Sequence, residues 1–253
     1  MAVNERDMMG GLAKGLKVIE AFSAERPRLS ISDAADIAGL DRATTRRCLL
    51  TLSEMGYAAY DGKFFTVTPK VLRLGTGCLA TMPLPRIVQP LLDRLSEEIG
   101  HSTSVSILDD TEIVYVARAA QQRVMSIALM PGSRLPAYCT SMGRVLLSAL
   151  TPERQREVLE HSRLVARTEK TMTGIDALLD ELEATRNRGY ALIDQEVEIG
   201  LRSIAVPVKT VRGQTVAALN VGLAASVASM EDLVERYLPP LLSVQRELGR
   251  MLA

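Results

Sequence analysis

Three arginines and two threonines lie within the six residues from Arg42 to Arg47, and no acidic residue interrupts them. Arginine can donate two hydrogen bonds to guanine O6 and N7, and threonine can contact a phosphate or a thymine methyl group. The chemistry available to this segment is therefore recognition of nucleic acid. The alternative is a solvated helix face, which is what most arginine clusters on helices are. The elements that position the segment decide between the two.

The surrounding sequence predicts two helices joined by a tight turn. The segment Ser32–Ala38 begins with a capping residue and carries small apolar side chains on one face. Gly39 provides the turn, Asp41 can cap a second helix over Arg42–Met55, and Gly56 ends that helix. Spacings of three and four residues predict an inward stripe on the second helix. This stripe comprises Thr45, Cys48, Leu49 and Leu52.

The remaining residues of the first turns form an outer face suited to the major groove of DNA. Thr45 belongs to both groups, and it is the member of the DNA-facing group most suited to the core instead. The predicted DNA-contacting residues of this helix are Arg42, Thr44, Thr45, Arg46 and Arg47.

A predicted β-hairpin follows the second helix. Two short β-rich runs, Tyr57–Tyr60 and Phe64–Val67, flank an Asp61–Gly62 turn. A helix, a turn, a helix and a hairpin in this order make a winged helix-turn-helix, a module that reads DNA. This context favours DNA recognition for the arginine segment. Lys63, in the wing, can touch a phosphate, although an exposed hairpin lysine without a function fits equally well.

Length and composition limit the classes of protein that remain. The 253 residues suffice for two domains, and 30 basic residues balance 30 acidic ones, so DNA binding must come from a local patch rather than from a polycation. Three widely separated cysteines fit a reduced cytosolic protein. The N-terminus lacks an apolar signal core, and no stretch is long enough for a membrane span. We therefore expect a soluble, cytoplasmic protein.

The rest of the chain predicts a linker helix and an α+β domain. Thr68–Pro69 begins an apolar helical stripe that continues to Met82, and a second subunit is the candidate partner for this stripe because dimers match two half-sites on DNA. The predicted boundaries are 10–68 for the winged helix-turn-helix, 69–85 for the linker helix and 86–253 for the second domain. Paired strands separated by helices predict an antiparallel or mixed sheet. Expected helices are 87–99, 141–150, 152–161, 176–188 and 230–252, and expected strands are 103–108, 112–117, 124–130, 190–194, 203–209 and 216–223.

The second domain carries little catalytic chemistry but has candidate binding segments. Its two histidines and scattered cysteines match no nucleophile, dinucleotide or metal motif, so we expect no enzyme, no metal and no cofactor. The loop 132–144 enters a helix whose N-terminus can hold an anion, or its Thr140 or Ser141 merely caps that helix. The acids of segment 194–203 either bind a ligand or pair with Arg202. Asn220, on a predicted core strand, must find a partner.

Taken together, these segments resemble the IclR family of bacterial transcription regulators over roughly residues 12–252. The marks of this resemblance are Leu12–Glu20, the helix-turn-helix, Gly189–Ala191 and Gly200–Pro207. Within the family, Leu135–Arg144 resembles the branch that regulates catabolism of protocatechuate, 4-hydroxybenzoate and the β-ketoadipate pathway.

The resemblance implies a C-terminal effector-binding and oligomerisation domain of GAF-like or profilin-like fold. It also implies dimers, paired into tetramers on DNA, and a small carboxylate effector. Three of the implied positions, Ser203, Asn220 and Gly222, depart from the glyoxylate-sensing type, and the room at Gly222 suits an aromatic acid or a six-carbon diacid. The implied effector-binding residues are Met142, Gly143, Asp194, Ser203, Asn220 and Gly222.

We therefore expect a regulator whose binding to double-stranded operator DNA responds to protocatechuate, 4-hydroxybenzoate or β-ketoadipate. One alternative is a small-molecule hydrolase or transferase fused to a DNA-binding arm, in which changing His101 or Asp194 abolishes turnover. The other is a ligand-independent architectural DNA binder, which gives no heat of binding with any of these acids.

Overall fold

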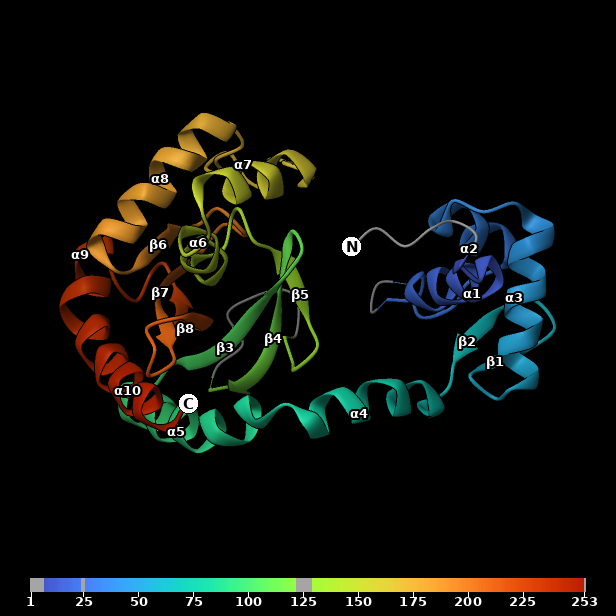
Figure 1. Ribbon diagram of the computed structural model, residues 1–253, viewed down its shortest axis with the longest axis horizontal. Helices are drawn as coiled ribbons and strands as arrows, with labels where there is room; N and C mark the ends of the chain where they lie inside the picture. Colours follow the sequence, from blue (N-terminus) through green and yellow to red (C-terminus); the bar gives the residue numbers. More distant parts are fainter. Residues whose placement is uncertain (1–6, 24–25, 122–128, 253) are drawn as a thin grey trace. The chain divides into compact units, whose positions relative to one another are not determined.

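The computed structural model describes residues 7–23, 26–121 and 129–252, and the chain divides into two compact units, residues 1–81 and 82–253 (Figure 1). None of the helices in these described ranges is long and apolar enough to cross a membrane. The first unit consists of α1 (Gly10–Glu20), α2 (Ile31–Ala38), α3 (Arg42–Glu54), β1 (Ala58–Tyr60), β2 (Phe65–Val67), the 3₁₀ turn η2 (Pro69–Val71) and α4 (Leu72–Thr81).

Local side-chain hydrogen bonds define the helix-turn-helix in the first unit. Ser30 and Asp33 cap α2 reciprocally, each side chain accepting from the other residue's backbone N–H. The sequence predicted this cap at Ser32, and the reciprocal pair starts the helix earlier. Gly39 ends α2 with a φ of 64°, a left-handed conformation that favours glycine. Asp41 then caps α3 by accepting from Thr44 N at 2.8 Å.

The second unit is built on a fully antiparallel sheet of order β5-β4-β3-β8-β7-β6. The mixed alternative from the sequence is therefore excluded. The strands of this sheet are β3 (Ser102–Asp109), β4 (Glu112–Ala119), β5 (Arg134–Pro136), β6 (Ala191–Asp194), β7 (Leu201–Lys209) and β8 (Thr215–Ala224). The helices are α5 (Pro83–Ile99), α6 (Ser141–Ser148), α7 (Pro152–His161), α8 (Ile175–Arg188), α9 (Met230–Asp232), the π-helix η3 (Leu233–Tyr237) and α10 (Leu238–Met251).

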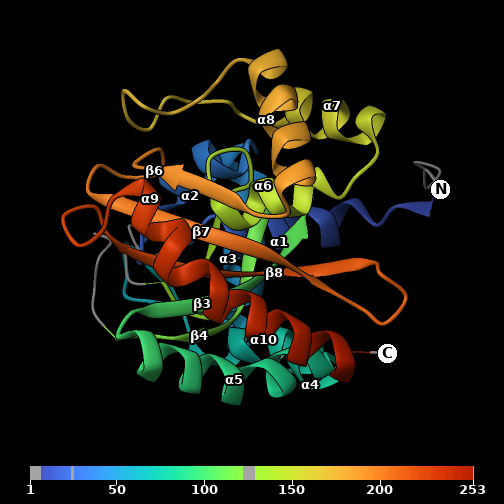
Figure 2. The ribbon, with the colours of Figure 1, turned by 90° about the vertical axis from the view of Figure 1, so that its left-hand side faces the viewer.

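Helices cover both faces of this sheet. Figure 2 shows α5 and α10 together on one side of the strands, and α6 and α8 on the other. Alternation along β8 explains the two layers, since Leu219, Val221 and Leu223 pack toward α5 and α10. Ala218 packs into the opposite core with α6 and α8, so Asn220 and Gly222 share that second face. The polar residue predicted on a core strand thus faces α6.

Several element boundaries differ from the sequence prediction. Helix α5 starts at Pro83, because proline is tolerated in a first helical turn, where amides lack internal partners. Near Pro239, the predicted closing helix changes to a π-helix and then to α10. Strand β5 was not predicted, since three residues carry too little pattern. The expected strand 124–130 falls largely outside the described residues.

Candidate DNA-binding and effector-binding sites

Helix α3 presents an exposed basic face. Arg42, Arg46 and Arg47 are exposed, and none of the three forms an ion pair with any described residue. Thr44 is half-buried beside them. An unpaired guanidinium keeps all its donors available for a phosphate or a base edge. The face therefore has the chemistry of a DNA-reading surface.

Thr45 requires a correction to the predicted DNA-contacting set. Its side chain is fully buried, and its hydroxyl donates to the Asp41 carbonyl at 3.0 Å. It lies in the inward stripe with Leu49 and Leu52. A helix residue cannot face the core and the major groove at once, so Thr45 holds the start of α3 in place and does not contact DNA.

The wing is shaped by one carboxylate. Asp61 accepts hydrogen bonds from the backbone N–H groups of Phe64 at 2.7 Å and Lys63 at 2.9 Å, and it pairs with Arg28. These bonds lower the pKa of Asp61 to about 2. The Lys63 ammonium lies 5.1 Å from the centre of the Phe64 ring. Lys63 is exposed at the tip of the hairpin, and the hydrogen bonds to Asp61 hold the backbone of this turn in place.

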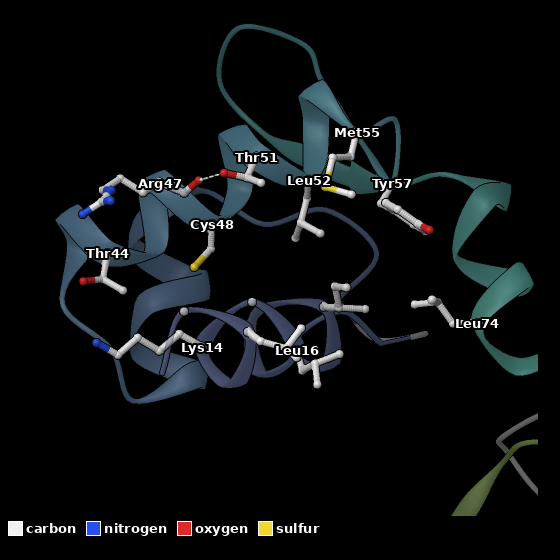
Figure 3. A pocket seen from close by; sticks show the side chains of 14 residues that line it. Lys14, Leu16, Thr44, Arg47, Cys48, Thr51, Leu52, Met55, Tyr57 and Leu74 are labelled. Carbon is white, nitrogen blue, oxygen red and sulfur yellow. Dashed lines mark hydrogen bonds between the residues drawn. The ribbon is translucent and has the colours of Figure 1, made fainter. Parts of the chain in front are cut away.

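A groove of about 520 Å³ lies between α1 and α3 (Figure 3). Its polar end is formed by Lys14, Thr44 and Arg47, and its apolar end by residues that include Leu16 and Leu74. Two of the predicted DNA-contacting residues, Thr44 and Arg47, therefore also line this groove. Any molecule seated in the groove touches the helix that presents the basic face.

A second cavity lies in the other unit, between the sheet and the first turn of α6. The described residues enclose about 40 Å³ there. Its polar lining includes a hydroxyl or amide from each of several strands, and its apolar lining comes from α6, from β5 and β7 and from the neighbouring loops. The lining residues are Ser102, Tyr115, Arg118, Leu129, Leu135, Thr140, Ser141, Met142, Val197, Leu201, Ser203, Asn220 and Gly222.

Three buried polar atoms in this lining have no hydrogen-bond partner among the described residues. They are Arg118 Nε, Ser141 Oγ and Asn220 Oδ1. A buried polar atom without a partner costs about 1–3 kcal/mol, and natural proteins rarely leave several in one place. Such a cluster indicates that a bound molecule supplies the missing partners.

Arg118 is the only cationic residue among the described residues of the lining, and the sequence pattern did not identify it. Its Nη1 donates to Ser104 Oγ at 2.8 Å, and it forms no ion pair with a described carboxylate. Burial lowers the pKa of its guanidinium. The sequence feature that could have identified Arg118 is its position between Ala117 and Ala119, at the end of an apolar strand.

Four of the six predicted effector residues line the cavity, and two do not. Met142, Ser203, Asn220 and Gly222 come together from α6, β7 and β8. Gly143 and Asp194 are not part of the lining.

Asp194 is engaged by two cations. Its carboxylate accepts from Arg202 Nε at 2.6 Å and pairs with Lys170 through the other oxygen. Burial disfavours the charged form, but hydrogen bonds from Lys170, Arg202 and Gln195 outweigh it and hold the pKa of Asp194 far below its usual range. Of the two alternatives for this acidic segment, the structure shows the internal pair.

Close packing against the Ala137 backbone requires a glycine at position 143. A Cβ at this position would lie 2.1 Å from the Ala137 carbonyl oxygen, which is backbone and cannot rotate away. We expect Gly143→Ala to lower the free energy of unfolding by about 3 kcal/mol or more, measured by urea denaturation. The matched control is Gly222→Ala, whose Cβ would meet only Leu201 Cδ1 at 4.0 Å. Equal stability of the two variants would contradict this packing role.

A buried ion pair connects α6 to the segment that follows β6. Arg144 Nη2 donates to Glu196 Oε2 at 2.7 Å, and Arg144 Nε donates to the Tyr138 carbonyl at 3.1 Å. The same Glu196 oxygen accepts from Met172 N at 3.0 Å. Because Met142 and Val197 line the cavity next to these residues, this pair fixes the distance between two of its walls.

Comparison with known proteins matches both units. Residues 11–62 match the IclR helix-turn-helix domain, and residues 76–250 match the bacterial transcriptional regulator IclR C-terminal domain. The chain is 42% identical to the Pca regulon regulatory protein of Pseudomonas putida, covering 97% of this chain and 85% of that protein. It is 37% identical to the p-hydroxybenzoate hydroxylase transcriptional activator of Acinetobacter baylyi, covering 98% and 94%.

A solved structure also resembles the second unit. It is the inducer-binding domain of a double mutant of the Acinetobacter PobR transcription factor, in complex with 3-hydroxybenzoic acid. The sequences are 35% identical, the TM-score is 0.63, and the match covers 66% of this chain and 98% of that one.

A helix-turn-helix domain followed by an IclR C-terminal domain defines a DNA-binding transcriptional regulator. The chain belongs to the IclR family of bacterial transcriptional regulators, and its close relatives regulate aromatic-acid catabolism. The family predicted from the sequence is confirmed.

Proposed function

We propose that a small carboxylate binds between the sheet and α6 and changes how tightly this regulator holds double-stranded operator DNA. The observation that carries the proposal is the convergence of Arg118 Nε, Ser141 Oγ and Asn220 Oδ1 on one cavity, without partners among the described residues. Arg118 is half-buried, and a carboxylate is its natural complement, because it neutralises the charge and accepts two hydrogen bonds. The first turn of α6 adds a favourable dipole for an anion.

The relatives support an effector from aromatic-acid catabolism. One is described as the activator of a p-hydroxybenzoate hydroxylase, and the solved PobR domain holds 3-hydroxybenzoic acid. Protocatechuate, 4-hydroxybenzoate and β-ketoadipate remain the candidates for this chain. A protein that acts on operator DNA in a bacterium works in the cytoplasm.

Binding has to enlarge the cavity. Ligand pockets commonly measure about 300 Å³ or more, whereas the described residues enclose about 40 Å³. An aromatic acid therefore favours a conformation in which the residues that line the cavity stand further apart than they do here. A ligand that binds one conformation better than another shifts the population toward it, and this shift is the proposed link to the DNA-binding unit.

We propose that the regulator acts as a homodimer that pairs into tetramers on DNA. Helix-turn-helix proteins read two half-sites with two copies. The groove of Figure 3 supports a contact between copies, because Leu12, Leu16, Met55 and Leu74 line it and are all more than 45% exposed. Apolar side chains gathered in this way mark interaction surfaces.

The hydrolase or transferase alternative named His101 and Asp194, and both side chains are occupied by contacts outside the cavity. The His101 ring packs edge-on against Tyr237, with ring centres 5.5 Å apart, and it does not line the cavity. Asp194 is held by two cations. Burial raises the pKa of the Cys139 thiol to about 11, so a thiolate nucleophile does not form there at neutral pH. We therefore propose that the effector is bound without being turned over.

A thermal-shift experiment tests the effector site. In the full-length protein, hydroxybenzoates at about 100 times their dissociation constant are expected to stabilise the fold by about 2.7 kcal/mol. In Arg118→Met the same acids should bind about 30-fold more weakly, because the charge-assisted hydrogen bonds of a half-buried arginine are lost.

The matched control is Arg134→Met, on the adjacent strand β5. Arg134 is exposed and pairs with Glu112 and Asp109, so its removal should leave effector binding unchanged. Unchanged affinity in Arg118→Met would show that the carboxylate binds elsewhere. An absence of binding by every acid tested would contradict the proposed function itself.

A further inference from the structure

We propose that the effector carries a hydrogen-bond donor at the end opposite its carboxylate, and that Asn220 selects for this donor. The chain then takes a hydroxylated aromatic monocarboxylate in preference to an ionised dicarboxylate such as β-ketoadipate. This inference rests on the proposed function, since it assumes that the cavity beside α6 is the effector site. It adds the chemical class of the effector and a residue that determines specificity.

The charge of the cavity provides for one carboxylate. Among the described residues of the lining, Arg118 is the only lysine, arginine or histidine, and no described acid forms an ion pair with it. One ligand carboxylate therefore balances the site. A second one would be buried against Leu135, Met142 and Leu201 without a cation, and burying an unpaired charge is strongly unfavourable.

The hydrogen-bonding chemistry at Asn220 points the same way. Its Oδ1 is a buried acceptor without a partner among the described residues, on the central strand β8 between β3 and β7. A carboxylate or ketone offers only acceptors at neutral pH and cannot satisfy it. A phenolic hydroxyl donates a hydrogen bond and can. The unpartnered Ser141 hydroxyl does not discriminate, because it can donate or accept.

The register of the sheet places the two ends of such a ligand. Arg118 pairs with Ser104, and Ser104 pairs with Asn220, so the three residues form one row across β4, β3 and β8. Neighbouring strands are about 4.8 Å apart, which separates the Arg118 and Asn220 backbones by roughly 10 Å. The middle of the row is occupied, because Ser104 Oγ already accepts from Arg118. A ligand lying across the strands can therefore meet the guanidinium at one end and the amide at the other.

The covering side chains suit an aromatic ring between these ends. Met142 lies in α6 over this face of the sheet and lines the cavity. Thioether sulfur makes favourable contacts with aromatic rings, and methionine adapts to irregular shapes. Gly222 leaves open space on the same face, since a Cβ added there would meet its nearest neighbour at 4.0 Å.

Titration calorimetry on the full-length protein tests the selection. The probes are benzoate, 3-hydroxybenzoate, 4-hydroxybenzoate, 4-methoxybenzoate, adipate and β-ketoadipate. We expect at least one hydroxybenzoate to bind about 5- to 150-fold more tightly than benzoate, as for one satisfied buried hydrogen bond. Methoxybenzoate, which cannot donate, should lose this advantage, and both dicarboxylates should bind more weakly than the hydroxybenzoate.

The variant Asn220→Leu identifies the residue responsible. Its preference for hydroxybenzoate over benzoate should fall to about one, while benzoate itself still binds. The ratio within one variant serves as its own control for folding, and the wild-type ligand series tests the inference even if the variant does not fold. Tighter binding of either dicarboxylate, or of benzoate, would overturn the inference and leave the proposed function intact. Loss of all binding in Arg118→Met, together with an unchanged hydroxybenzoate-to-benzoate affinity ratio in Asn220→Leu, would show that a residue other than Asn220 accepts the ligand's hydrogen bond.

Discussion

Replacing Arg46 and Arg47 together with alanine is expected to weaken operator binding by about 2–6 kcal/mol, or roughly 30-fold to 20,000-fold. Both side chains are exposed on α3 and unpaired within the described part of the chain, so all their donors are available to DNA. A good arginine–base contact contributes about 1–3 kcal/mol of discrimination. Affinity for operator and for unrelated DNA should be measured by fluorescence anisotropy at several salt concentrations.

The salt dependence separates the two kinds of contact that these arginines can make. If both touch phosphates, the slope of log K against log salt falls by about two, and affinity for all sequences drops alike. If they read bases, the slope is kept and specificity is lost. The matched control is Arg154→Ala with Arg156→Ala on α7, which removes the same charge from exposed pairs with Glu157 and Asp176 in the other unit. Operator affinity equal to that of this control would rule out α3 as the reading helix.

Replacing Glu196 with glutamine is expected to lower the free energy of unfolding of the second unit by about 3–5 kcal/mol. The Arg144 side chain is 3% exposed, and Glu196 is its close carboxylate partner; Glu181 lies 4.0 Å away. Glutamine keeps the size of the side chain but leaves the guanidinium charge buried without that partner. Urea denaturation should show a lower midpoint with an unchanged slope.

The control for this prediction is an exposed pair. Glu157→Gln breaks the pair with Arg154, in which both side chains are at least half exposed, so the stability is expected to stay essentially unchanged. The double variant Arg144→Met with Glu196→Leu should be more stable than Glu196→Gln, because it removes both buried charges. If the two glutamine variants are equally stable, the buried pair is not what holds α6 to the segment after β6.

The sequence predicted most elements because their signals are local. The Asp41 cap, the Gly39 turn and the Asp61–Gly62 turn each use contacts within a few residues, and the structure shows all three. The prediction missed β5 because three residues carry too short a pattern. It placed the N-cap of α2 at Ser32, whereas Ser30 caps the helix in the structure. Helix α5 began earlier than predicted because prolines mark helix starts as well as linkers.

The candidate site was only partly predictable for a different reason. Asn220 stood out because a polar residue within an apolar strand must have a partner. Arg118 did not, since its importance depends on which strand pairs with β4 and on which helix covers that face. Asp194 and Gly143 fit the pattern of the family, yet here they serve an ion pair and a close backbone contact.

The sequence by itself determined most of the elements and the basic face of α3, because these depend on short-range spacing and on residue type, and its resemblance to known regulators gave the family. Only the tertiary structure decided which side chains are buried together. Thr45 is buried in the core, and Asp194 pairs with Lys170 and Arg202. Arg118, Ser141 and Asn220 line one cavity. The physical reason is that burial and pairing between strands are long-range properties. A residue's partner across a sheet is set by register and by the covering helix, and neither is determined by the neighbouring sequence.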